Sequence, residues 1–274
     1  MGISSLVVAV RGIGDVGSAI AHRLFQAGHK VWIHDDPLPA APRRGMSFAD
    51  AAFDGSAVLE GVTATRYENP NKFAKALQAG REIPVYLGNL FEMLSYLDPS
   101  VLVDARMRKH GEPERQTSLA PFTVGLGPNL EAGETASVVV ETQWGDDLGK
   151  VITSGRTKEL EGEPREYGGF SRERFVYAPV EGVFHTDRKI ADRVEPGELV
   201  AWMEDLLLTA PLGGILRGLV HDSVPVVQGA KVIEVDPRGD PAHVFGIGER
   251  PRRIAEGVLE AIQARSQRSA VKTR

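Results

Sequence analysis

The sequence predicts an α/β protein in two parts: a front part built on a parallel sheet with helices, and a smaller β-rich part behind it. Three observations predict this division. A short apolar strand near the N-terminus runs into a glycine-rich turn and an amphipathic helix. Further strand-like runs end in glycines or charged residues. Beyond residue 170 a short motif occurs twice. A chain of 274 residues can bury a sizeable core and divide into two domains.

The composition excludes several classes of protein. The formal net charge is −5, so no overall positive field favours nucleic acid. The chain has no cysteine, which rules out disulfides, thiolate metal sites, iron–sulfur clusters and a cysteine nucleophile. Its histidines lack metal-ligand spacing, and we expect no protein-bound metal. No stretch has the length of a signal peptide or membrane helix, and we expect a cytoplasmic protein without a membrane partner.

The strongest motif lies at the start of the chain. The apolar run 5–10 is followed by Gly12, Gly14 and Gly17 in the pattern G-x-G-x-x-G, then by a helix that stops near Gly28. A second strand, 30–36, then reaches Asp35. In such a unit the first glycine permits a tight turn, the second lets a phosphate approach the backbone, and the third lets helix and strand pack closely. These residues predict a Rossmann-like nucleotide-binding unit.

Two carboxylates qualify this interpretation. Asp35 follows the glycine turn by about 20 residues, where a carboxylate can accept hydrogen bonds from ribose hydroxyls. Asp15 stands directly after Gly14, where it would stabilise the helix but repel a pyrophosphate. The alternative therefore stays open that the turn is kept for packing alone.

Other candidate residues lie in loops or at strand ends. Arg43 belongs to a loop and could clamp a phosphate or carboxylate, or simply face solvent. Because ligands of open α/β sheets bind at the carboxyl ends of the strands, polar residues and glycines there are candidates for the same site. Those at strand ends are Asp104, Arg106, Gly125, Gly127 and Glu141. We expect Asp104, Arg106 and Glu141 to converge on the glycine turn; no residue is assigned a catalytic role.

The back part contains an internal duplication. The run 178–182 (APVEG) recurs as 210–214 (APLGG), and 194–197 (VEPG) recurs as 226–229 (VVQG), both at a shift of 32 residues. Two interlocked copies of this pattern resemble the barrel-sandwich of biotinyl and lipoyl carrier domains. Their attachment lysine stands at the join of the halves, where this chain reads WMEDLLLTAP. We therefore expect a β domain without biotin or lipoate.

The predicted organisation has four segments. A Rossmann-like domain covers 1–170 and a duplicated barrel-sandwich domain covers 171–250. A C-terminal helix follows over 251–264, and a disordered basic tail over 265–274. We expect the last helix to pack against the front domain.

The ordered motifs together resemble the YqeB-type family, accessory proteins of the selenium-dependent molybdenum hydroxylase system. The motifs are RGIGDVG, PRRGMSFADAAFDG, VDARM, PFTVGLGPNLEAG, VVVETQWGDDLGKVI, the A-P-x-x-G repeat and EVDPRGD. The resemblance covers residues 6–263 and is specific only in combination.

The resemblance implies a maturation protein that handles a nucleotide-containing ligand for an apo molybdenum hydroxylase. The implied ligand is an NAD-like dinucleotide or a molybdopterin dinucleotide, and oligomers are compatible with it. Two alternatives stay open. One is an NAD(P)-dependent oxidoreductase, although the chain has no Tyr-x-x-x-Lys pair. The other is a non-enzymatic scaffold with an empty glycine turn, so whether the protein is an enzyme is left undecided.

Overall fold

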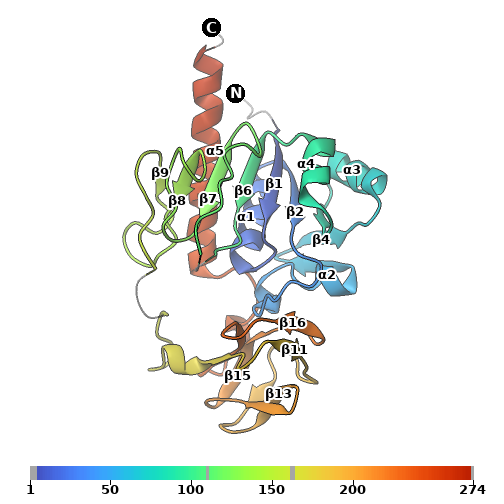
Figure 1. Ribbon diagram of the computed structural model, residues 1–274, viewed down its shortest axis with the longest axis vertical. Coiled ribbons are helices and arrows are strands. Elements are labelled where there is room, and N and C mark those ends of the chain that lie inside the picture. The colour runs from blue at the N-terminus through green and yellow to red at the C-terminus, as the bar shows by residue number, and fades with distance from the viewer. Residues whose placement is uncertain (1–4, 109–110, 161–163, 273–274) are drawn as a thin grey trace.

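The front part is a nine-stranded mixed sheet with helices on both faces (Figure 1). This computed structural model describes residues 5–108, 111–160 and 164–272. In spatial order the strands are β3 (Ser56–Leu59), β4 (Val62–Arg66), β5 (Ile83–Tyr86), β2 (Lys30–His34), β1 (Val7–Arg11), β6 (Val101–Asp104), β7 (Thr123–Leu126), β8 (Val138–Val140) and β9 (Val151–Ile152). From β4 to β8 neighbouring strands run parallel, while β3 and β9 close the two edges antiparallel.

Alternating side chains of the central strands supply two separate cores. Val8, Val10 and their neighbours on one face pack against helices α1 (Asp15–Gln26) and α5 (Glu249–Lys272). On the other face Ala9, Trp32 and Leu102 pack against helices α3 (Pro70–Ala79) and α4 (Leu90–Leu97). Because both faces are covered, the central strands are apolar throughout, as buried parallel strands require. A short helix, α2 (Ala51–Asp54), leads into β3.

The glycine turn between β1 and α1 is fixed by close backbone packing. Gly12 has φ +114°, and a Cβ there would lie 2.9 Å from the Ala105 carbonyl carbon. A Cβ at Gly17 would lie 1.9 Å from the Gly12 carbonyl oxygen. These two glycines are therefore required by the fold itself, whether or not a ligand binds.

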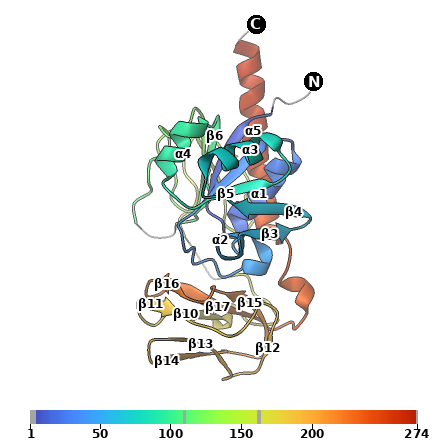
Figure 2. The ribbon, with the colours of Figure 1, turned by 90° about the vertical axis from the view of Figure 1, so that its right-hand side faces the viewer.

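The back part consists of three small sheets below the large one (Figures 1 and 2). The four-stranded sheet has the order β10 (Phe175–Tyr177), β17 (Lys231–Asp236), β15 (Gly214–Leu219) and β12 (Arg193–Val194). The two-stranded sheets pair β11 (Gly182–Phe184) with β16 (Val224–Val226), and β13 (Leu199–Met203) with β14 (Leu206–Thr209). The described residues also contain three short 3₁₀ turns, at Arg44–Met46, Arg172–Arg174 and Pro241–His243.

The strand register follows the repeat that the sequence predicts. A shift of 32 residues exchanges the two halves and carries paired positions of β12–β15 and β13–β14 onto those of β16–β11 and β17–β10. The exchanged pairs are Val194↔Gly214 with Val226↔Gly182, and Leu199↔Thr209 with Lys231↔Tyr177. Even the flanking turn bonds correspond, since the amides of Gly197 and Gly229 donate to the carbonyls of Ala210 and Ala178, each over 2.9 Å.

The predicted fold class, a Rossmann-like domain joined to a barrel-sandwich domain, is wrong. The front sheet is mixed, because the hairpin β3–β4 and the short strand β9 add antiparallel edges to the parallel centre. The back part is three separate small sheets. The glycine motif predicts only the first strand–helix–strand unit of the sheet. The sequences of the edge strands contain no motif that would have predicted their antiparallel pairing.

Helix α5 is longer than predicted and packs on the front part, as expected. It continues to Lys272, so residues 265–272 are helical where a disordered tail was predicted, and 273–274 lie outside the described residues. The segment contains neither glycine nor proline beyond Gly257, so nothing in it breaks the helix. Arg265 also donates to the Ser100 carbonyl oxygen over 2.8 Å. Among the described helices, none is long and apolar enough to cross a membrane.

We predict that Gly257→Ala destabilises the protein although alanine is the better helix former. A Cβ at Gly257 would lie 1.9 Å from the Gly149 carbonyl oxygen, and backbone cannot rotate aside. Overpacking of this kind costs about 1–3 kcal/mol, which exceeds the gain of about 1 kcal/mol in helix propensity. Urea unfolding measures the change, with Gly213→Ala as the control because its nearest atom would be 3.5 Å away. Equal stability of Gly257→Ala and wild type would contradict the packing described here.

Candidate functional site

The carboxyl ends of the parallel strands face the back part (Figure 1). After β1 the chain builds β2, β4 and β5 on one side, then returns to β6 on the other side of β1. The sheet order therefore reverses between β1 and β6, where ligands of open α/β sheets bind. The glycine turn and Asp104 lie on either side of this point, since Arg11 pairs with Asp104 and the Ala105 amide donates to the Arg11 carbonyl over 2.8 Å.

Gly14 is the open position of the glycine turn. Its φ is −62°, and a Cβ there would meet no atom within 4 Å, unlike Gly12 and Gly17. Gly14 caps helix α1 without a side-chain hydrogen bond. The first amides of an α-helix have no carbonyl partner within the helix, and they carry a partial positive charge. An anion thus has both room and donors beside Gly14.

Asp35, at the end of β2, holds the same turn. Its Oδ2 accepts a 2.6 Å hydrogen bond from the Ile13 amide, and its Oδ1 accepts one of 2.8 Å from the Asp36 amide. Burial raises the pKa of Asp35 above its ordinary value despite these bonds. Each oxygen keeps a second lone pair, so the carboxylate can accept a hydroxyl as well.

Asp15 and Arg43 are paired with each other. The Arg43 guanidinium donates to Asp15 Oδ2 over 2.8 Å and to Glu234 of β17 over 2.9 Å. Although burial opposes ionisation of Asp15, the charge and hydrogen bond of Arg43 lower its pKa. The predicted repulsion of a phosphate by Asp15 is thus offset by Arg43, which serves as a bridge from helix α1 to the back part.

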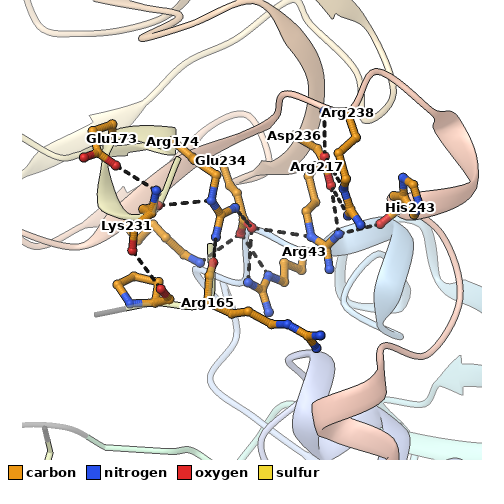
Figure 3. A network of polar contacts seen from close by, with 12 residues as sticks. Arg43, Arg165, Glu173, Arg174, Arg217, Lys231, Glu234, Asp236, Arg238 and His243 are labelled. Atoms are coloured by element: carbon orange, nitrogen blue, oxygen red, sulfur yellow. Dashed lines mark hydrogen bonds and ion pairs between the residues drawn. The ribbon is translucent and has the colours of Figure 1, made fainter. Parts of the chain in front are cut away.

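Glu234 is the centre of a buried ion cluster between the two parts (Figure 3). Its carboxylate has no exposure and lies among four cations: Arg174 at 2.8 Å, Arg43 at 2.9 Å, Lys231 at 3.0 Å and Arg217 at 3.4 Å. Burial alone would raise the pKa of Glu234, but the charges of Arg43 and Lys231 hold it well below its usual range.

A second carboxylate extends the cluster. Asp236 accepts from Arg217 over 3.1 Å and from Arg238 over 2.6 Å. The guanidinium groups of Arg174, Arg217 and Arg238 also lie over the ring of Tyr167, at 4.2–5.2 Å from its centroid.

A small open cleft lies at the carboxyl ends of β6 and β7. Its walls combine apolar side chains such as Leu126 and Leu130 with charged ones, including Asp104, Arg108 and Glu114. Small apolar clefts with a few convergent polar groups are the usual form of a ligand site. Gly125 lines the cleft too, and a Cβ there would come within 3.1 Å of Leu130.

Asp104 and Arg106 form a bidentate pair beside this cleft. Arg106 Nε and Nη2 donate to the two Asp104 oxygens over 2.9 and 2.6 Å, and Nη2 also donates to Glu114. Asp104 and Glu114 raise the pKa of Arg106 against the opposing effect of burial. Arg11 lies beneath them, 91% buried at its side chain, and donates to Gln116 Oε1 over 2.6 Å.

The remaining predicted residues have structural roles. Glu141 lies past β8 and accepts hydrogen bonds of 2.8 Å from the amides of Thr142, Gln143 and Lys158. The Gly127 carbonyl accepts from the Thr157 hydroxyl over 2.8 Å. The structure therefore brings Asp104 and Arg106 to the glycine turn, as predicted, but leaves Glu141 three strands away.

Several residues of the site are not among the candidates that the sequence predicts. Arg11 and Glu234 lie within the motifs RGIGDVG and EVDPRGD, and Glu114 and Lys231 lie outside the quoted motifs, but the residues next to each of them do not indicate its ion-pair partners. Only the apolar character of β17, whose neighbouring valines and isoleucine are buried on both faces, could have indicated that Glu234 is buried.

Comparison with known sequences gives one informative relative. No protein-family model matches the chain. The chain is 37% identical over 256 residues to the uncharacterized protein YqeB of Escherichia coli (strain K12). The match covers 93% of this chain and 47% of that protein, so the chain spans about half the length of the curated relative it matches. The match supports the YqeB-type resemblance.

Solved structures show weak similarity of another kind. They include the ectoine utilization protein EutE (DoeB) of Ruegeria pomeroyi, with product bound, at 14% identity and a TM-score of 0.25. A succinylglutamate desuccinylase/aspartoacylase of Rhodobacter sphaeroides has 15% identity and a TM-score of 0.27. An aspartoacylase family protein of Mesorhizobium loti has 11% identity and a TM-score of 0.26. Each match covers 85% of both chains, and at these scores the similarity carries no functional argument.

The comparisons bear on two expectations. The three neighbours named here are an ectoine utilization protein, an aspartoacylase family protein and a succinylglutamate desuccinylase/aspartoacylase, and none is named as a Rossmann-like or barrel-sandwich protein. The expected role in molybdenum hydroxylase maturation has no support from the sequence relative, which is uncharacterized.

We predict that Glu234→Gln destabilises the protein by about 3–5 kcal/mol, because removal of one partner leaves buried charges uncompensated. Urea unfolding near pH 7 measures the loss, with the exposed Glu181→Gln as the control.

The contribution of Glu234 to stability should depend on pH. Since the pKa of Glu234 is depressed on folding, this contribution is present above about pH 4.5 and is lost as pH falls through the folded pKa. The difference between wild type and Glu234→Gln should therefore narrow in acid. A constant difference would contradict the charge assignment.

Lys231 should give stability a pH dependence in the alkaline range. Burial lowers the pKa of Lys231 to about 8, from 10.5. Between these values the unfolded chain binds more protons than the folded protein, so stability rises with pH. We predict that Lys231→Met reduces this rise between pH 8 and 10, and that the exposed Lys189→Met leaves it intact. Parallel pH profiles for wild type and Lys231→Met would exclude a depressed pKa at this lysine.

Proposed function

We propose that this protein binds a nucleotide-containing ligand of the dinucleotide type along the carboxyl edge of its large sheet. The ligand phosphates would lie at the start of helix α1 beside Gly14. The observation that carries the proposal is the contrast within the glycine turn. Gly12 and Gly17 are required by packing, but Gly14 is not, and a Cβ there would enter empty space. A glycine without a packing reason at this place is explained by the close approach of a ligand.

The surroundings of Gly14 suit the two ends of such a ligand. On one side Asp35 can accept hydrogen bonds from ribose hydroxyls. On the other side, past β6, the cleft lined by Leu126 and Leu130 offers space for a ring or a second sugar. Both lie at the carboxyl edge, so a single extended molecule would pass Gly14 between them.

The ion cluster offsets the negative charge of Asp15, so a phosphate can bind at the start of helix α1. Asp15 alone would repel an anion, but Arg43 neutralises it at 2.8 Å. Arg250, at the start of α5, adds a further positive charge that acts on Asp15. The scaffold alternative, in which side chains fill the glycine turn, has no support at Gly14.

Gly14→Asp tests the proposal with little risk to the fold. Aspartate is a favoured residue at a helix N-cap, and its charge suits the helix dipole. The same charge would repel a phosphate. We predict that one of NAD, NADP, FAD, ATP or CTP raises the thermal stability of the wild-type protein. At 100 times its Kd the gain is about 2.7 kcal/mol, and we expect Gly14→Asp to lose it.

Asn69→Asp is the matched control, since Asn69 caps helix α3 after β4 and accepts from the amides of Asn71 and Lys72. It adds the same charge at another helix start and should keep the ligand response. Absence of stabilisation by all five nucleotides, or an undiminished response in Gly14→Asp, would refute a nucleotide site at this turn.

A further inference from the structure

A carboxylate and three guanidinium groups meet at the cleft beside β6. Glu114 accepts a hydrogen bond from Arg106 and lies 3.6 Å from both Arg11 and Arg108. Arg106 and Arg11 come from the strand ends, and Arg108 follows them in the loop after β6. This arrangement places one negative group where three positive groups converge.

From this geometry we propose that Arg11, Arg106 and Arg108 form a phosphate subsite in which the Glu114 carboxylate stands in for the ligand. An incoming phosphate would displace Glu114 and take its place among the guanidinium groups. The subsite is separate from the Gly14 position and does not depend on the nucleotide proposal.

The exposure of the residues supports displacement. The side chain of Glu114 is 44% exposed, so it can turn into solvent without disturbing the core. Arg11 and Arg106 are 9% and 16% exposed, so they stay in place. The Arg11 Nε is buried without a hydrogen-bond partner, which is unusual for a guanidinium and marks an incompletely satisfied donor.

The charges select the class of ligand. When Glu114 turns away, Asp104 is the one carboxylate among the described residues that still pairs with these arginines, through Arg11 and Arg106. The local charge is then about +2, which matches the charge of about −1.5 to −2 of a phosphate monoester near pH 7. Guanidinium groups also suit phosphate geometrically, because they donate two parallel hydrogen bonds. The open cleft lined by Leu126 and Leu130 lies beside the subsite, so the rest of the ligand would extend along it toward solvent.

Binding of inorganic phosphate to Glu114→Gln tests this subsite. Glutamine keeps the size of the side chain but removes the charge that competes with the ligand. We expect Kd for phosphate to fall about tenfold or more relative to wild type, because the fraction of protein with a free subsite rises. Calorimetric titration of the full chain at constant ionic strength measures this Kd. For acetate at the same concentrations, Glu114→Gln should increase the affinity much less.

Two further variants make the outcome decisive. Glu112→Gln changes the charge of another residue that lines the cleft, and it should leave Kd near the wild-type value. Arg108 has a side chain that is 62% exposed. When Arg108→Gln is added to Glu114→Gln, we expect Kd for phosphate to rise several-fold again. An unchanged Kd in Glu114→Gln, or an equal gain in Glu112→Gln, would overturn the proposal. The gain should persist in the Gly14→Asp background; its loss there would mean that the phosphate lies at helix α1 instead.

Discussion

The relation between the two parts of this molecule depends on the buried carboxylate of Glu234. A carboxylate without solvent needs compensation by charge and hydrogen bonds, and here four cationic side chains supply it. One of them, Arg43, comes from the front part and also binds Asp15 at the start of helix α1. The same arginine therefore joins the back part to the glycine turn, and the orientation of the β sheets is tied to the electrostatics of the candidate site. A hydrophobic interface of the same area would hold the parts together but would not make this connection.

The sequence predicted well those features that depend on neighbouring residues. The first strand, the glycine turn and helix α1 form a local pattern in which Gly12 and Gly17 have steric reasons, and the structure has them at the expected place. The repeat of 32 residues also appears as a repeat of strand register. The edge strands were missed because β9 has two residues and β3 shows half-exposed side chains, and both patterns are common in loops. The end of helix α5 was missed because its polar sequence suggested a tail.

The candidate site was predicted only in part, for a physical reason. Glycine turns and strand ends have sequence signatures, so Gly14, Asp35 and Asp104 could be found. Ion clusters form between residues far apart in the chain, as Arg43 and Glu234 do, and a single arginine or glutamate carries no mark of its partner. For Arg43 the sequence left two alternatives, an anion clamp or a side chain facing solvent, and in the structure its guanidinium binds two carboxylates of the chain itself. Glu141 was a candidate ligand-binding residue because it stands at a strand end. In the structure its carboxylate accepts hydrogen bonds from three backbone amides of the chain itself.

The duplication places different side chains at equivalent positions of the back part. Lys231 and Glu234 of β17 belong to the ion cluster, and the equivalent positions of β13 are Leu199 and Trp202. Strands β13 and β14 lie at the far end of the molecule (Figure 2), and they present the exposed side chains of Leu206 and Leu207. The shift of 32 residues carries the pair β10–β17 onto the pair β14–β13, so each copy contributes one strand beside the front part and one strand at the exposed end of the molecule.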